Sequence, residues 1–193
     1  INEIGFETYQ KILEEAIEEL KENEFKTLFE NENRSTQKNY VKEVQVDTDF
    51  EILFPDEYIN IVNERLLLYN ELSAIKDEPQ LMKFKKNIED RFGEIPPPGQ
   101  ELLGTLRLKW LASKMGLERL IIKNKKCVGY FLADQQSPFY QSAIFNQILL
   151  SVQNQPDQFS IKEKETRNGL RLLLVVNQAQ SIENLLDQLQ KLQ

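Results

Sequence analysis

Hydrophobic positions recur every three or four residues through the first two thirds of the chain, and this spacing predicts amphipathic helices. One helix is expected over residues 6–28, with glutamates crowding the face opposite its apolar stripe. That acidic face is either solvated or a sign that the helix serves as a strut against a neighbour. A second helix is expected over about 60–75, with Val62, Leu66, Tyr69 and Leu72 facing inward.

Two further helices are expected on either side of residues 90–98, which read DRFGEIPPP. Asp77 is a suitable N-cap for the first of them, and Gly93 stands where a helix commonly ends in a left-handed residue. The prolines prevent immediate continuation, and Pro98 can begin the next helix because a first-turn residue does not need its N–H. The pattern predicts a stiff elbow with Phe92 buried and Asp90 and Arg91 either solvated or paired locally.

From residue 117 onward the pattern changes to short apolar runs bounded by turn residues, which indicates strands. Runs over 120–122 and 127–132 flank a tight turn, and runs over 159–165 and 170–176 flank an Asn-Gly hairpin turn. Serine-initiated helices follow each pair. We therefore predict an α+β fold: a helical part with a helix–elbow–helix, then a ββαββα unit whose antiparallel sheet has both helices on one face.

The composition excludes several classes of active site. The 193 residues contain no histidine and one cysteine, so neither Ser-His or Cys-His catalysis nor a structural zinc site is expected. There is no glycine-rich phosphate loop, so no cofactor and no metal are expected in this chain. A hydrolase based on two carboxylates stays open, because such a pair can form in the fold. Cys127 is expected to be a buried thiol within a strand.

The charge balance and the lone cysteine bear on partners and location. With 24 basic and 31 acidic residues the net charge is −7, which opposes phosphate-backbone binding by the whole surface. A local basic surface at Arg107, Lys109 and Lys114, with the 123–126 turn, is a possible DNA contact. Lack of a signal segment, an apolar span or paired cysteines predicts a cytoplasmic location without membrane contact. Because the chain starts at Ile1, we expect a fragment or a processed chain.

Several ordered blocks across residues 50–120 carry a family resemblance. They are Pro55-Asp56-Glu57-Tyr58-Ile59, Arg65-Leu66, Leu68-Tyr69, Asp90-Arg91-Phe92-Gly93 with Pro96, Leu102-Leu103, Leu106, Leu108-Lys109, Ala112 and Gly116-Leu117. Together they resemble the C-terminal domain of the bacterial transcription-repair coupling factor. Glu3-Ile4-Gly5-Phe6 and Tyr9 are similar to the stretch that leaves the family's motor, whereas the last 75 or so residues follow only in element order.

The resemblance implies a piece of a larger ATP-driven translocase on double-stranded DNA. That protein acts on RNA polymerase stalled at DNA damage and recruits UvrA for nucleotide excision repair, with ATP and Mg²⁺ bound in its motor domains. The domain itself is implied to be non-catalytic: it docks on the protein's UvrB-like module, masks the UvrA-binding surface and restrains the motor. By the same resemblance, residues 1–29 continue from the motor, 30–47 form a polar linker and 48–193 form the regulatory domain. Within it, 48–116 are mainly helical and 117–193 form the ββαββα unit.

The resemblance also assigns roles to residues at the elbow. Asp90 is implied to meet basic side chains of the UvrB-like module, and Asn87 stands where the family often has a second carboxylate. Glu89 and Glu94 can share the contact. The expected structural motif consists of Tyr58, Arg65, Tyr69, Arg91, Phe92, Gly93 and Pro96. The alternative hypothesis is a DNA-contacting accessory domain that uses Arg107, Lys109 and Lys114.

Overall fold

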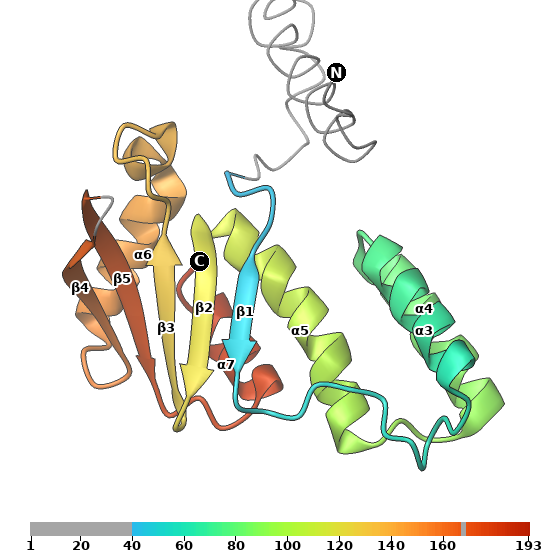
Figure 1. The fold of residues 1–193 in the computed structure, drawn as a ribbon. Helices are drawn as coiled ribbons and strands as arrows, with labels where there is room; N and C mark the ends of the chain where they lie inside the picture. The colour runs from blue at the N-terminus through green and yellow to red at the C-terminus, as the bar shows by residue number, and fades with distance from the viewer. Residues whose placement is uncertain (1–39, 167–168) are drawn as a thin grey trace, which may run out of the picture. The chain divides into compact units, whose positions relative to one another are not determined.

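The computed structural model describes residues 40–166 and 169–193 (Figure 1). The expected helix over 6–28 and the assignment of 1–29 to a motor domain lie outside this part of the chain. The predicted α+β class is confirmed.

Within the described residues, five strands form one mixed sheet. They are β1 (Gln45–Thr48), β2 (Leu117–Lys123), β3 (Lys126–Phe131), β4 (Phe159–Thr166) and β5 (Gly169–Asn177), in the spatial order β1-β2-β3-β5-β4. β2, β3, β5 and β4 pair antiparallel as predicted, but β1 runs parallel to β2. The antiparallel pairing predicted within residues 117–193 is confirmed, and β1 is an additional, parallel edge strand that the prediction did not include. The long helical connection from β1 to β2 gives the chain the crossover that a parallel neighbour requires.

β1 also corrects the predicted linker over 30–47. The described part of that stretch enters the sheet at Gln45 and buries Val41 and Val44 in the core. Polar residues dominate the stretch in sequence, yet Val44 and Val46, two residues apart at the start of this short edge strand, both pack against the core. The folded unit therefore includes residues before position 48.

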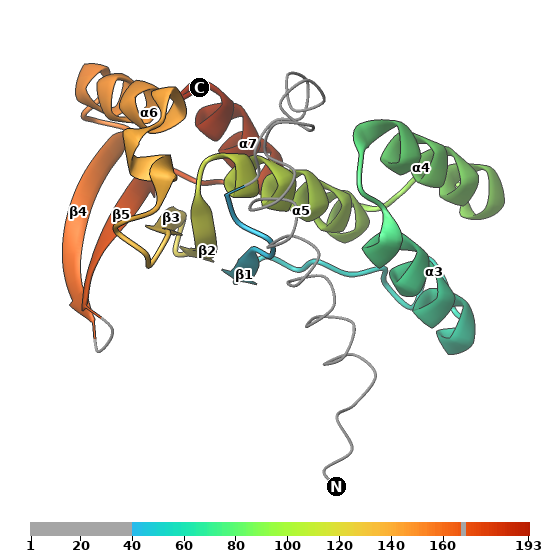
Figure 2. The same ribbon diagram turned by 90° about the horizontal axis from the view of Figure 1, so that it is seen from above.

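The helices are α3 (Val62–Ala74), α4 (Glu78–Phe92), α5 (Pro97–Lys114), α6 (Ala143–Asn154) and α7 (Ile182–Gln190), with a short 3-10 helix η1 (Pro138–Gln141). After α5 the elements follow in the order β2, β3, η1, α6, β4, β5, α7. Figures 1 and 2 show α5, α6 and α7 on one side of the sheet, with α3 and α4 beside α5. This leaves the other side of the sheet without a helix among the described residues.

Two hydrophobic clusters share the helix α5. Leu108, Ala112 and Met115 belong to the cluster formed with the sheet, α6 and α7. Leu103, which lies more than one turn closer to the start of α5, belongs to a second cluster formed with α3, α4 and the loop before α3. Because α5 is one continuous helix of 18 residues, it fixes the α3–α4 pair relative to the sheet.

The inward face of α3 differs from the prediction. Leu72 is buried and Tyr69 is partly buried against the helical cluster, but Val62 and Leu66 are 57% and 54% exposed. Leu68 is buried instead. The sequence carries apolar residues all around this helix, so periodicity alone could not select which of them face the core.

Candidate functional site

The predicted elbow is confirmed between α4 and α5. α4 ends at Gly93, whose φ is 85° and whose N–H donates to the Glu89 carbonyl at 2.9 Å. The next helix restarts at Pro97, one residue earlier than expected, and the Pro96 carbonyl accepts the N–H groups of Gly99 and Gln100 at 2.9 and 3.0 Å. Both helix ends are thus closed by local hydrogen bonds, which makes the corner stiff.

Tyr58 ties the loop before α3 to the elbow. Its hydroxyl donates to the Gly93 carbonyl at 2.8 Å, and its ring meets Phe92 edge-on with centroids 6.0 Å apart. Burial, with a smaller contribution from Glu89, raises the pKa of the Tyr58 phenol. The phenol therefore stays protonated near neutral pH and acts as the donor.

Tyr69 and Arg65 hold the same loop from α3. The Tyr69 hydroxyl accepts the N–H of Phe54 at 2.9 Å, and the two rings stack 5.5 Å apart. Arg65 donates to the Ile59 carbonyl at 2.5 Å and pairs with Asp56 at 2.8 Å. Tyr69 and Arg65 therefore hold the loop before α3 in place, and this loop supports the elbow.

Arg91 closes the corner from outside. It forms an ion pair with Glu64, and its guanidinium lies 4.8 Å from the centre of the Phe92 ring. Phe92 is only half-buried and packs against the edge of the helical cluster, so its predicted place inside the core is wrong. The side chain lies at the last turn of α4, where the Tyr58 ring packs against it edge-on and the Arg91 guanidinium lies over its ring.

The carboxylates expected to meet a partner lie on the solvent side of this corner. Asp90, Asn87 and Glu94 are exposed, whereas Glu89 is half-buried and 3.7 Å from Lys85. Asn87 and Asp90 are three residues apart on α4 and so share one face. Neither Asp90 nor Glu94 forms an ion pair within residues 40–166 and 169–193. Their charges are therefore available to a partner.

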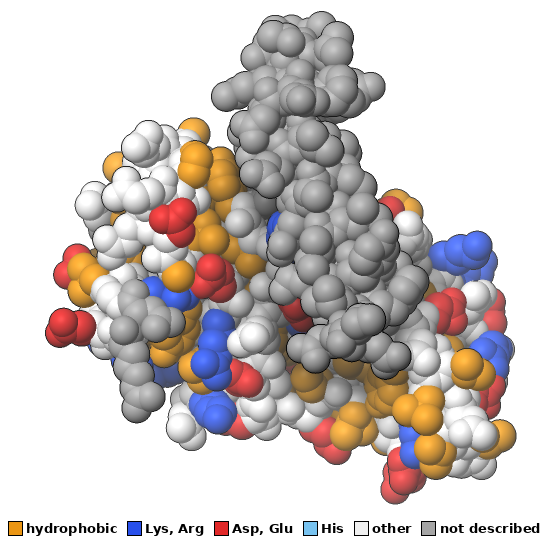
Figure 3. All heavy atoms as spheres, turned by 45° about the horizontal axis from the view of Figure 1, so that its top comes forward, with side chains coloured by type: hydrophobic (Ala, Val, Ile, Leu, Met, Phe, Trp, Pro, Cys, Tyr) orange, Lys and Arg blue, Asp and Glu red, His pale blue; other side chains and the backbone are white. Residues whose placement is uncertain are grey.

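An apolar surface beside the elbow was missed by the sequence reading. Its members are the exposed aliphatic residues of α3 and its start, Ile61, Val62, Leu66 and Leu67, which we call the α3 ridge. The pair Arg91–Glu64 joins the end of α4 to the start of α3, which places the ridge next to the elbow. Figure 3 shows exposed hydrophobic side chains among charged ones over α3 and α4. The run Leu66-Leu67-Leu68 was the available signal, because three successive apolar residues cannot share one helical face.

Among the basic residues of α5, Arg107 is neutralised by an acidic partner on α4. Arg107 holds Glu78 through three hydrogen bonds, Nη2 to Oε1 at 2.5 Å, Nε to Oε2 at 2.8 Å and Nε to Oε1 at 3.0 Å. This pairing holds the pKa of Glu78 below its usual value and raises the pKa of Arg107. Lys109 and Lys114 are half-buried and line a hollow of about 740 Å³ that Asp77 and Glu78 also line. The three cations do meet at one hollow, but with carboxylates among them.

The remaining chemistry of the described residues is sparse. Cys127 is fully buried as expected, and burial raises the pKa of its thiol to about 12. In the part of the chain that the structure describes, no group of three or more histidine, cysteine, aspartate or glutamate residues is arranged to hold a metal ion. No helix there is long and apolar enough to cross a membrane.

Comparisons with known proteins point to one family. Residues 48–142 match the TRCF domain family. The chain is similar to the transcription-repair-coupling factor of Escherichia coli (strain K12), with 33% identity over 117 residues that cover 61% of this chain and 10% of that protein. The factor of Buchnera aphidicola subsp. Baizongia pistaciae (strain Bp) is 28% identical over 176 residues, which cover 89% of this chain and 22% of that protein.

A solved structure shares the fold. The crystal structure of the C-terminal domain of transcription-repair coupling factor superposes with a TM-score of 0.57 and 16% identity, covering 81% of this chain and 95% of that one. The chain thus spans most of a solved domain but only about a tenth to a fifth of these two relatives.

Proposed function

The chain belongs to the transcription-repair coupling factor family, and from this premise we propose that it is a regulatory interaction domain of such a protein. In this proposal the elbow and the α3 ridge dock on the UvrB-like module of the same protein. Docking masks the surface that binds UvrA and restrains the motor. ATP hydrolysis with Mg²⁺, translocation on DNA and the encounter with RNA polymerase in the cytoplasm belong to the parent protein and form part of the proposal.

The observation that carries the proposal is the pairing of exposed, unneutralised carboxylates with an exposed apolar ridge on a rigid corner. Protein interfaces combine an apolar centre with a charged rim, and an exposed apolar patch of this kind marks an interaction site. Here Leu66 and Leu67, 54% and 68% exposed, supply the centre. Asp90 and Glu94 supply the rim, with Asn87 as a hydrogen-bonding neighbour.

The expected free energy of docking suits a contact that forms and releases reversibly. Each aliphatic side chain of the ridge stabilises a contact by roughly 1.5–3 kcal/mol when fully buried, and association entropy offsets much of that gain. A free-energy difference of a few kcal/mol between the docked and released states is enough to change which of the two states predominates. Rim charges such as Asp90 then set the association rate and the salt sensitivity.

The alternative, a DNA-contacting accessory domain, has less support at α5. Arg107 is bound to Glu78, and the hollow near Lys109 and Lys114 includes acidic side chains. A duplex contact through Arg107 would have to break the ion pair that already holds α4 to α5.

UvrA binding by the full parent protein tests the proposed function. We expect Asp90→Lys to raise the affinity for UvrA about tenfold, equivalent to ~1.4 kcal/mol, because charge reversal repels the basic partner surface and releases the mask. The matched control is Asp157→Lys, which reverses an exposed acid in the loop between α6 and β4. Equal UvrA affinity in wild type, variant and control would contradict a mask at the elbow.

A further inference from the structure

Figure 2 shows that α5, α6 and α7 all lie on one side of the sheet, and the strand register assigns a distinct set of side chains to the opposite side. Strand register identifies them, because Leu120, Cys127, Leu174 and Phe159 all point into the core and their neighbours in each strand point the other way. We call the resulting surface the open sheet face. Its members are Gln45, Asp47, Arg119, Ile121, Lys123, Lys126, Val128, Tyr130, Ser160, Lys162, Lys164, Arg171, Leu173 and Val175.

The open sheet face is basic although the chain is acidic. Among the described residues its cations are Arg119, Lys123, Lys126, Lys162, Lys164 and Arg171. Asp47 pairs with Arg119 and Glu118 pairs with Arg171, each at 2.5 Å. The four lysines form no ion pair with another described residue. A chain of net charge −7 therefore gathers unneutralised positive charge on one side of its sheet.

An aromatic ring lies at the centre of this surface. Tyr130 is half-buried on β3, between Arg119 on β2 and Leu173 on β5 in the same row across the sheet. Lys162 continues that row on β4, and the Lys164 ammonium is 5.8 Å from the centre of the Tyr130 ring. The next row consists of Ser160, Val175, Val128, Ile121 and Asp47, so an aliphatic floor adjoins the ring.

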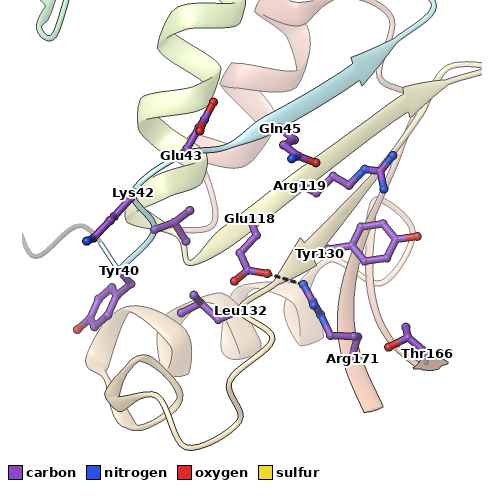
Figure 4. Close-up of a pocket in the computed structure, with 11 residues that line it drawn as sticks. Tyr40, Lys42, Glu43, Gln45, Glu118, Arg119, Tyr130, Leu132, Thr166 and Arg171 are labelled. Atoms are coloured by element: carbon purple, nitrogen blue, oxygen red, sulfur yellow. Dashed lines mark hydrogen bonds and ion pairs between the residues drawn. The ribbon is translucent and has the colours of Figure 1, made fainter. Parts of the chain in front are cut away.

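The surface is also hollowed beside the ring. A groove of about 570 Å³ runs between the segment before β1 and the strands β2, β3 and β5. Tyr130, Arg119 and the Glu118–Arg171 pair line it, as Figure 4 shows. Glu43 lies at its margin, so the groove itself is mixed in charge and the unneutralised lysines lie outside it, toward β4 and the β2–β3 turn.

We propose that the open sheet face binds single-stranded nucleic acid without strong sequence preference. Such binding combines cations that follow the phosphate backbone with an aromatic side chain on which a base can stack. Tyr130 offers the stacking surface, and Lys162 and Lys164 offer phosphate contacts. A duplex keeps its bases stacked on one another and offers no base face to Tyr130, so single strands are the favoured ligand. The surface shares no residue with the elbow and is independent of docking there.

The first test is fluorescence anisotropy of a labelled oligothymidylate of about twelve nucleotides, within the ~4–16 nucleotide site sizes of single-strand binding folds. The complete chain should bind it, and binding should weaken as salt rises. We expect Lys162→Gln with Lys164→Gln to lower the affinity at least about tenfold at low salt and to reduce the slope of log K against log salt by about 1.4, which is ~0.7 for each lost phosphate contact. The control pair Lys83→Gln with Lys86→Gln on α4 should leave both unchanged.

The second test separates base stacking from general attraction of anions. Tyr130→Leu should lower the affinity about five- to a hundredfold, whereas Tyr130→Phe should bind as the wild type does. Thermal melting checks that each variant is folded. Asp90→Lys, which tests the elbow, should bind the oligonucleotide normally.

Three results would overturn the proposal. One is no oligonucleotide binding by the wild type at low salt, and another is equal affinity for duplex and single strand. The third is a combination of two observations: only the lysine variants lose affinity for the oligonucleotide, and polyglutamate competes for the wild type as well as the oligonucleotide does. That combination would identify an acidic protein segment as the ligand.

Discussion

At the scale of single residues, the two phenylalanines of α4 occupy different environments. Phe84 is 2% exposed within the helical cluster, while Phe92 is half-buried under the Arg91 guanidinium. We expect Phe84→Ala to cost roughly 3–5 kcal/mol of unfolding free energy, the usual range for a buried phenylalanine, and Phe92→Ala to cost clearly less. Urea denaturation of both variants measures the difference, and equal losses would contradict the half-buried position of Phe92.

The ion pair between Glu78 and Arg107 predicts a pH dependence of stability. Hydrogen bonding to Arg107 holds the pKa of Glu78 below its unfolded value, so the native state stabilises the charged form. That stabilisation is present above the unfolded pKa of about 4.3 and is lost as pH falls through the lower folded pKa. Because both side chains are well exposed, we expect a small effect.

The matched comparison is Glu78→Gln against the wild type. The variant should melt at a lower temperature at pH 7, and the gap should shrink as the pH is lowered below about 4. Gln80→Glu serves as a control for surface charge near the same helix start. A gap that persists unchanged in acid would show that Glu78 stabilises the helix by means other than its charge.

At the scale of elements, the elbow depends on the backbone conformation of Gly93. Its φ of 85° and ψ of −165° belong to a region that is essentially restricted to glycine. No atom lies within 4 Å of the position that a Cβ would take. We therefore expect Gly93→Ala to destabilise the fold by about 1–3 kcal/mol through conformation alone, measured by thermal melting. Glu94→Ala next to it should change stability little, and a neutral Gly93→Ala would contradict the strained corner.

The elbow was predictable from sequence because its determinants are local. Asp77 caps α4 by accepting the Gln80 N–H at 2.9 Å, and Gly93 ends the helix that Asp77 begins. The parallel edge strand β1 was not predictable, because its partner β2 lies more than 60 residues away along the chain. The exposed α3 ridge was missed for a related reason: the burial of Leu68 rather than Leu66 is decided by packing against other elements.

Most contacts of the site residues join segments that are distant in the sequence, so residue spacing alone could not predict them. Tyr58, Tyr69 and Gly93 were expected to form a structural motif because of the family resemblance, but their hydrogen bonds join residues 35 and 15 positions apart, Tyr58 to Gly93 and Phe54 to Tyr69. The engagement of Arg107 by Glu78 depends on how α4 and α5 cross, which no spacing within one helix reveals. The open sheet face likewise exists only after strand register places lysines from two hairpins on one side.

At the scale of the whole described unit, α5 connects two regions with separate surfaces. Its first half packs under the elbow and α3, and its second half packs under the sheet. Glu101 of α5 accepts the Ile182 N–H at 2.8 Å, which also fixes the start of α7. The elbow can therefore dock on a partner while the open sheet face remains a separate surface of the same unit.

Calorimetric titration of this chain with the UvrB-like module that we propose as its partner is the sharpest test of docking at the elbow. We expect binding that weakens with salt, weakens further with Asp90→Lys, and is unchanged by Asp157→Lys. We expect Leu66→Ser to weaken binding as well, because the α3 ridge supplies the apolar centre of the proposed contact. Binding that is insensitive to both Asp90→Lys and Leu66→Ser would show that neither the elbow nor the α3 ridge forms the interface.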